Sequence, residues 1–144
     1  MIKNISIGFI SLFLSIFTFE FLHAENSYFE SGKKLFNNKK FTDSRFYFEK
    51  DIVSNPKSEN SYLYLAKIFK KEKKEDLEKN NLNTVLLLNP KNEEAIYLLT
   101  LLNIKQSNFL KAGELIKTMS SICKKMCSTE VELKEKLDSS QKSQ

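Results

Sequence analysis

The sequence has few of the residues that interrupt helices. Its 144 residues include three glycines and two prolines, and tryptophan is absent. Because glycine and proline are the strongest local breaks in regular structure, their scarcity favours a chain that is helical throughout. The length allows one domain at most. Leucine, isoleucine, phenylalanine, lysine and glutamate are abundant, as expected for an all-α protein.

Arginine is nearly absent, since Arg45 is the only one among 23 basic residues. The net charge of +5 permits an anionic partner. The lysines, however, alternate with acidic residues and form no arginine-rich face, so we expect no nucleic-acid binding. The charged run at 70–75 is interpreted as a solvated helix end with ion pairs.

The first 24 residues form a segment of a different kind. Lys3 precedes an apolar run from Ile5 to Phe19, and a Leu-His-Ala tripeptide ends at Ala24. These are the three zones of a secretory signal peptide, with cleavage after Ala24. The apolar run is shorter than the ~20 residues that span a bilayer. We therefore expect an exported protein, periplasmic or secreted, with an uncleaved membrane anchor as the alternative.

Catalytic chemistry has little support in the sequence. The only histidine, His23, lies in the segment expected to be removed, so the mature chain has no imidazole for acid–base work or metal ligation. Glycine-rich phosphate loops, nucleophile elbows and haem attachment motifs are also missing. We expect a protein that is not an enzyme and that holds no cofactor.

The rest of the chain contains an internal sequence repeat. Ser54-Asn55-Pro56-Lys57 recurs as Leu88-Asn89-Pro90-Lys91, with the prolines 34 residues apart. This period is typical of helix-turn-helix repeats that stack into an α-solenoid. Other positions with the same spacing keep their character, namely the small residues Gly32 and Ala66, the small residues Ser44 and Ala112, and the apolar sets Tyr28, Tyr62 and Ile96, Leu35 and Phe69, and Phe48, Leu82 and Ile116.

This register of small, aromatic and proline positions resembles the tetratricopeptide repeat (TPR) family over residues 25–126. The resemblance implies an α-solenoid of three TPR-like repeats at 25–58, 59–92 and 93–126, followed by a capping helix and a disordered tail at 127–144. The middle repeat departs most from the pattern. Glu75 stands where its neighbours have Phe41 and Phe109, and Glu78 where they have small residues, so we expect a looser turn at 73–76.

Amphipathic spacing predicts helices at 26–38, 42–54, 59–71, 76–88, 93–105 and 109–122. Ser58 and Asn92 are predicted to cap the third and the fifth of these helices. Thr129 and Glu132 have the spacing of a capping box, which predicts the start of a last helix. Beyond Asp138 we expect disorder.

The only cysteines are Cys123 and Cys127, which fall where the sixth helix is expected to end. An even number of cysteines in an exported chain favours a disulfide, which would tie the last helix to the last repeat. Two free thiols are one alternative. Another is a Cu(I) site built from Met119, Cys123, Met126 and Cys127, because soft sulfur ligands select that ion.

In the TPR family, the first helix of each repeat lines a concave groove. The resemblance therefore implies partner-binding residues next to the buried stripe of each first helix, with apolar anchors and lysines in every repeat: Phe29, Lys33, Phe36, Leu63, Lys67, Lys70, Tyr97, Leu101 and Lys105. The alternative is that Phe29, Leu63 and Leu101 pack between repeats. The chaperone-binding carboxylate-clamp pattern is not met, because Glu94 and Leu98 stand where cations are needed.

The resemblance implies a non-enzymatic protein–protein interaction module that holds a peptide or protein segment. Together with the signal peptide, it predicts a scaffold or assembly factor of the bacterial cell envelope. The alternatives are a periplasmic Cu(I)-handling protein and, if the signal segment is retained, a membrane-tethered assembly factor.

Overall fold

The computed structural model describes residues 28–142, and the regular secondary structure in that range is helical. The chain divides into two compact units, Met1–Pro56 and Lys57–Gln144. The predicted signal peptide, with His23 and the cleavage position after Ala24, lies outside the described residues. The prediction of an all-α fold is confirmed.

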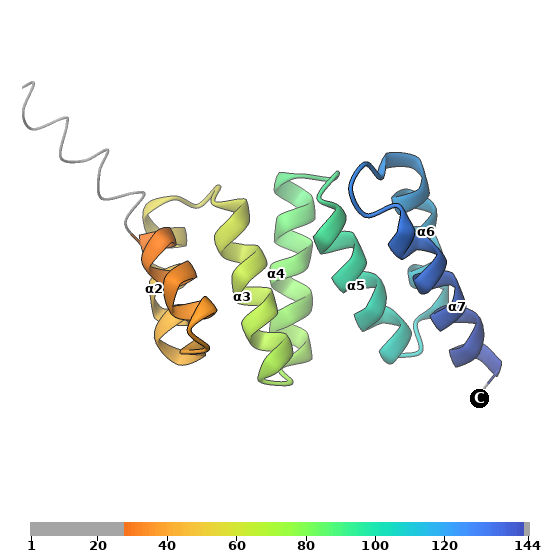
Figure 1. Ribbon diagram of the computed structural model, residues 1–144, viewed down its shortest axis with the longest axis horizontal. Coiled ribbons are helices and arrows are strands. Elements are labelled where there is room, and N and C mark those ends of the chain that lie inside the picture. The colour runs from red at the N-terminus through yellow and green to blue at the C-terminus, as the bar shows by residue number, and fades with distance from the viewer. Residues whose placement is uncertain (1–27, 143–144) are drawn as a thin grey trace, which may run out of the picture. The chain divides into compact units, whose positions relative to one another are not determined.

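The first unit contains a helical segment at 28–37 and helix α2 (Phe41–Ser54). The second unit contains α3 (Glu59–Lys71), α4 (Glu75–Leu88), α5 (Glu93–Lys105), α6 (Phe109–Ile122) and α7 (Ser128–Lys142). The bounds of α2 to α6 agree with the predicted ranges to within one residue. In the second unit, α4 packs on both α3 and α5, and α7 packs on both α5 and α6 (Figure 1).

The turns inside the helix pairs share one backbone geometry. Lys39, Lys73 and Ser107, spaced by 34 residues, have φ angles of 61°, 58° and 56°. The N–H that follows each of them donates to the carbonyl five residues earlier, at 2.8 to 2.9 Å. This is a left-handed helix C-cap, in which main-chain bonds close the turn whatever the side chains are. The looser turn predicted at 73–76 is therefore wrong.

The core of the second unit is apolar and runs through α3, α4, α5 and α6. Most of α5 is buried, which explains why its sequence is the most apolar of the six labelled helices. Two proline-containing turns separate the helix pairs, since α2 and α4 both end two residues before a proline. The main cluster consists of Leu63, Ala66, Leu82, Val85, Ala95, Ile96, Leu98, Leu99, Leu115 and Met119.

The structure tests the two N-cap residues predicted from the sequence, Asn92 and Ser58. The Asn92 side chain accepts a hydrogen bond from the Ala95 N–H at 2.8 Å, so this predicted cap is confirmed. Ser58 occupies the N-cap position of α3, but its side chain makes no capping bond and its Oγ instead lies 3.1 Å from the Ser61 hydroxyl. The hydroxyl of Ser58 therefore stabilises the first turn of α3 without capping its main chain.

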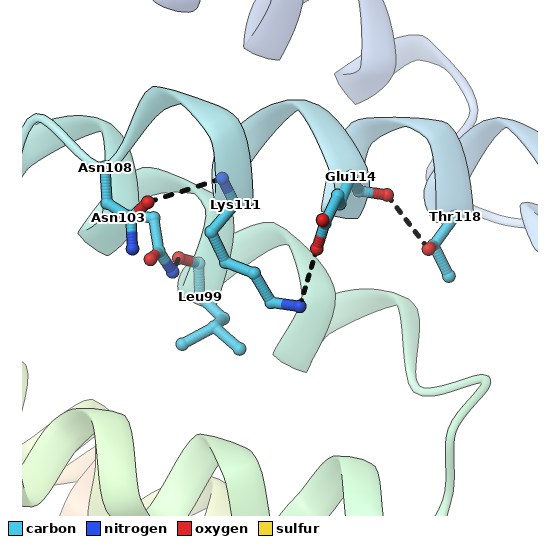
Figure 2. Close-up of polar contacts among 6 residues, drawn as sticks. All are labelled: Leu99, Asn103, Asn108, Lys111, Glu114 and Thr118. Carbon is cyan, nitrogen blue, oxygen red and sulfur yellow. Dashed lines mark hydrogen bonds and ion pairs between the residues drawn. The ribbon is translucent and has the colours of Figure 1, made fainter.

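Polar contacts also form within each helix of the α5–α6 pair. Asn108 caps α6 by accepting from the Lys111 N–H at 3.4 Å, and Lys111 Nζ lies 2.8 Å from the Glu114 carboxylate (Figure 2). On α5, the buried Asn103 donates from Nδ2 to the Leu99 carbonyl at 2.7 Å (Figure 2). Asn103 stands at a position where the other repeats have apolar residues, and this internal bond satisfies its amide N–H.

Two predictions for the last helix are wrong. Thr129 lies inside α7, which begins at Ser128, and its Oγ1 donates to the Met126 carbonyl at 2.6 Å, so it does not form a capping box with Glu132. The helix also continues to Lys142, past the predicted onset of disorder at Asp138. Lysine and glutamine favour helices, and Ser139 bonds back to the Lys136 carbonyl at 3.0 Å.

Candidate binding face

The predicted groove residues of the second unit lie on α3 and α5. We call Lys67, Lys70, Glu94, Tyr97, Leu101 and Lys105 the α3–α5 face. Leu63 does not belong to it, because it is 5% exposed and packs in the core. For Leu63 the structure thus supports the alternative interpretation, packing between helices.

Two lysines of the α3–α5 face are already paired. Lys67 Nζ lies 2.7 Å from Glu94 Oε1, and Lys105 Nζ lies 2.7 Å from Glu75 Oε1. The hydrogen bond between Glu75 and Lys105 lowers the pKa of Glu75 and raises the pKa of Lys105. Exposed ion pairs contribute little to stability, so a ligand carboxylate can displace them. Neither lysine, however, offers a ligand an unpaired ammonium group.

Tyr97 connects the α3–α5 face to α7. Its hydroxyl donates to Glu132 Oε1 at 3.1 Å. Burial, and then this contact with a carboxylate, raises the pKa of Tyr97. Leu133, fully buried, anchors the same helix. The Tyr97 end of the face is therefore bordered by α7, and the opposite end, near Leu101 and Lys105, opens into a hollow.

A hollow of about 140 Å³ lies at that open end. Three predicted groove residues, Lys70, Leu101 and Lys105, line it together with Lys73, Glu75, Glu78 and Leu102. Glu78 is only 4% exposed, and burial raises its pKa although the nearby Lys70 opposes this effect. The hollow thus combines an apolar wall, a buried carboxyl group and a basic rim.

In the first unit, the predicted groove residues contact one another or α2. The Phe29 ring packs on Phe48 with centroids 5.8 Å apart, and the Phe36 ring packs edge-on against Phe41 at 5.3 Å. Lys33 lies 5.8 Å above the Phe29 ring and 4.0 Å from Glu30. All three predicted residues are half-buried, so they pack within the first unit and expose only part of their surface to a ligand.

An apolar surface on α2 was not predicted. Phe46 is 52% exposed and Val53 is 82% exposed, and both line a hollow of about 460 Å³ with Tyr28 and Lys50. The Lys50 ammonium lies 4.6 Å from the Phe46 ring centroid. The predicted groove residues all lie on the first helix of a repeat, whereas Phe46, Lys50 and Val53 lie on the second helix of their pair.

The structure joins Cys123 and Cys127 in a disulfide, with Cα atoms 5.1 Å apart. The bridge closes the loop between α6 and α7. The Glu93 carboxylate binds the same loop, accepting hydrogen bonds from the N–H groups of Lys124, Lys125 and Met126 at 2.7 to 3.3 Å. Consecutive N–H groups that converge on one anion form a nest, here occupied by the first residue of α5.

The Glu93 contact has a counterpart one repeat earlier. Glu59, 34 residues before Glu93, is the first residue of α3 and accepts a hydrogen bond from Asn89 Nδ2 at 2.9 Å, and another from the Asn92 side chain. Each of these acids therefore holds the turn that precedes the next helix pair. The 34-residue spacing between Glu59 and Glu93 is present in the sequence, but the contacts that these acids make with the turns are not.

Replacing Glu93 with glutamine is expected to loosen the loop between the cysteines. The loop N–H bonds, chiefly that of Met126, lower the pKa of Glu93 below 4.5, although burial opposes them. A lowered folded-state pKa means that the stabilisation is complete above the unfolded pKa and is lost as the pH falls through the folded pKa. NMR should show the amide protons of 124–126 shifted downfield, titrating below pH 4.5 in the wild type and released at neutral pH in Glu93→Gln.

Glu94→Gln is the matched control, because it removes the same charge from the same turn and leaves the loop bonds in place. The role assigned to Glu93 fails if the loop amide protons keep their positions in Glu93→Gln.

Three of the four sulfur atoms considered for Cu(I) are otherwise engaged in this structure. Cys123 and Cys127 are bonded to each other and so present no thiolate, and Met119 is fully buried in the core. Within residues 28–142, clusters of three or more His, Cys, Asp or Glu side chains able to hold a metal are absent. A Cu(I) site would require reduction of the disulfide and movement of Met119.

In sequence, the chain matches no protein-family model and no curated protein. Its fold is similar to that of solved TPR structures. One is the Yersinia enterocolitica type III secretion chaperone SycD in complex with a peptide of the translocator YopD, with a TM-score of 0.71 and 9% identity over 81% of this chain and 91% of that one.

Two further structures come from RPAP3. The first TPR of Spaghetti (RPAP3) bound to an HSP90 peptide has a TM-score of 0.69 and 14% identity, covering 80% of this chain and 91% of that one. The first TPR domain of human RPAP3 has a TM-score of 0.70 and 16% identity, covering 85% and 98%. The chain therefore has the TPR fold.

Among the described residues, every helix is too short or too polar to cross a membrane.

Proposed function

We propose that this chain is a non-enzymatic binding module that holds a peptide or protein segment on the α3–α5 face. The observation that carries the proposal is the TPR fold together with the hollow beside Leu101, where apolar and basic side chains adjoin. Solved structures of the same fold contain peptides of partner proteins, YopD for SycD and HSP90 for RPAP3.

We also propose that the module works in the bacterial cell envelope as a scaffold or assembly factor. Two features support this location: the signal-peptide pattern that ends at Ala24, and the Cys123–Cys127 disulfide. Disulfides persist in oxidising compartments and are rare in the cytosol. The same disulfide favours the binding module over Cu(I) handling.

N-terminal sequencing of the protein isolated from cells tests the proposed export. We expect Glu25 to be the first residue, because cleavage follows Ala24 in the signal pattern. An intact Met1 in the membrane fraction would instead support the tethered assembly factor.

Capture tests the proposed binding activity. The full chain and residues 25–144 serve as bait in envelope extracts, and cross-linking with mass spectrometry identifies the bound segment. A synthetic peptide of that segment should then bind the purified chain, and hydrogen exchange should be slowed on α3 and α5. Protection confined to the exposed apolar residues Leu87 and Leu110, on α4 and α6, would place the site elsewhere.

A further inference from the structure

The hollow at the open end of the α3–α5 face occupies a position that the other repeats fill with apolar side chains. In the 34-residue register, Lys70 and Glu75 correspond to Phe36 and Phe41 in the first repeat and to Ile104 and Phe109 in the third. Phe36 and Phe41 pack together there. Lys70 and Glu75 leave a space of about 140 Å³ in the second repeat. The chain thus lacks one aromatic side chain at this position.

The size of the hollow fits one aromatic ring. An apolar cavity of ~150 Å³ accommodates a benzene molecule, and this hollow has about 140 Å³. Leu101 and Leu102 supply the apolar wall against which a ring can pack.

One carboxyl group in the hollow has no hydrogen-bond partner among the described residues. Glu78 is 4% exposed, and among residues 28–142 it accepts no hydrogen bond and forms no ion pair. Glu75, by contrast, is bonded to Lys105 and Gln106. The Glu78 oxygens are not fully enclosed, because Asn103 Oδ1 is the one buried side-chain atom among the described residues without a partner, so they reach water through the hollow. A ligand that displaces this water and brings a donor to Glu78 therefore gains more than one that brings none.

We propose that the hollow receives one tyrosine side chain of the bound segment, with its ring against Leu101 and Leu102 and its hydroxyl donating to the Glu78 carboxylate. This inference rests on the proposed function and names the residue type that the site selects. Phenylalanine would fill the space but leave Glu78 without a donor. A lysine or arginine side chain would bring a cation to a rim where Lys70 and Lys73 are exposed and unpaired among the described residues.

NMR titration of the full chain with two small probes tests the inference. N-acetyl-tyrosinamide should shift the methyl signals of Leu101 and Leu102 at lower concentration than N-acetyl-phenylalaninamide. The usual strength of a hydrogen bond to a charged group predicts that the tyrosine probe binds about tenfold more tightly than the phenylalanine probe. Equal binding of the two probes, or no shift at these leucines, would overturn the inference.

Two variants locate the binding within the hollow. Glu75→Phe restores the residue found in the neighbouring repeats, so it should fill the space and abolish the tyrosine-dependent shifts. Glu78→Gln keeps the shape and removes the charge, so it should reduce the preference for tyrosine severalfold with little effect on the phenylalanine probe. If Glu75→Phe fails to fold, the titration of Glu78→Gln alone decides whether the tyrosine hydroxyl binds Glu78.

Failure of the tyrosine inference can be distinguished from failure of the proposed binding function. A captured segment that binds Glu75→Phe as tightly as the wild type overturns the tyrosine inference and leaves the binding module intact. A tyrosine probe that behaves as expected while no segment binds the purified chain supports the hollow and overturns the module.

Discussion

Replacing Leu82 with aspartate is expected to unfold the second unit. Leu82 is fully buried on α4, within the cluster that joins α3, α4, α5 and α6. An unpaired charge at such a position costs several kcal/mol, against a total stability of about 5–15 kcal/mol for a domain. Circular dichroism should show loss of most of the helical signal at 25 °C.

Leu87→Asp is the control, since Leu87 lies on the same helix and is 82% exposed. Surface substitutions of this kind change stability by at most about 0.5 kcal/mol. The packing described for the second unit is incorrect if both variants melt at the wild-type temperature.

Gly32→Ala is expected to destabilise the first unit by about 1–3 kcal/mol, the usual cost of overpacking. A Cβ atom at Gly32 would lie 2.8 Å from the Phe48 ring. The approach is close because Ser44 Oγ also donates to the Gly32 carbonyl at 2.8 Å in a buried position. Neither the fully buried Phe48 nor α2 can move away without breaking this packing.

Gly113→Ala provides the opposite result and serves as the control. Gly113 lies inside α6, and a Cβ atom there has no neighbour within 4 Å. Alanine should therefore stabilise the helix by about 0.5–1 kcal/mol. Urea denaturation of both variants measures the two effects, and equal midpoints would contradict the close packing at Gly32.

The repeat register and the helices were predictable because they depend on local signals that recur. The proline turns after Ser54 and Leu88 and the apolar periodicity lie in the sequence itself. The left-handed turns at Lys39, Lys73 and Ser107 were not predicted, since none of these residues is glycine. Main-chain hydrogen bonds shape them, and the sequence carries no side-chain signal for those bonds.

The surface properties of the α3–α5 face depend on partners distant in sequence. Glu94 neutralises Lys67 and Glu75 neutralises Lys105, and neither pairing follows from the spacing within one helix. Likewise, Glu132 has the spacing of a capping box with Thr129 but contacts Tyr97 instead. The departures at Glu75 and Glu78 were visible as broken positions in the register, but only the structure shows the hollow between them.

The affinity of the captured segment for the Leu101→Ala variant tests the central claim most directly. Leu101 is half-buried beside the hollow, so its truncation should weaken binding by about 1–2 kcal/mol, as at the centre of an interface. Leu110→Ala, on an 80% exposed residue of α6, should bind like the wild type. If Leu101→Ala keeps full affinity while Leu110→Ala loses it, the partner does not bind the α3–α5 face.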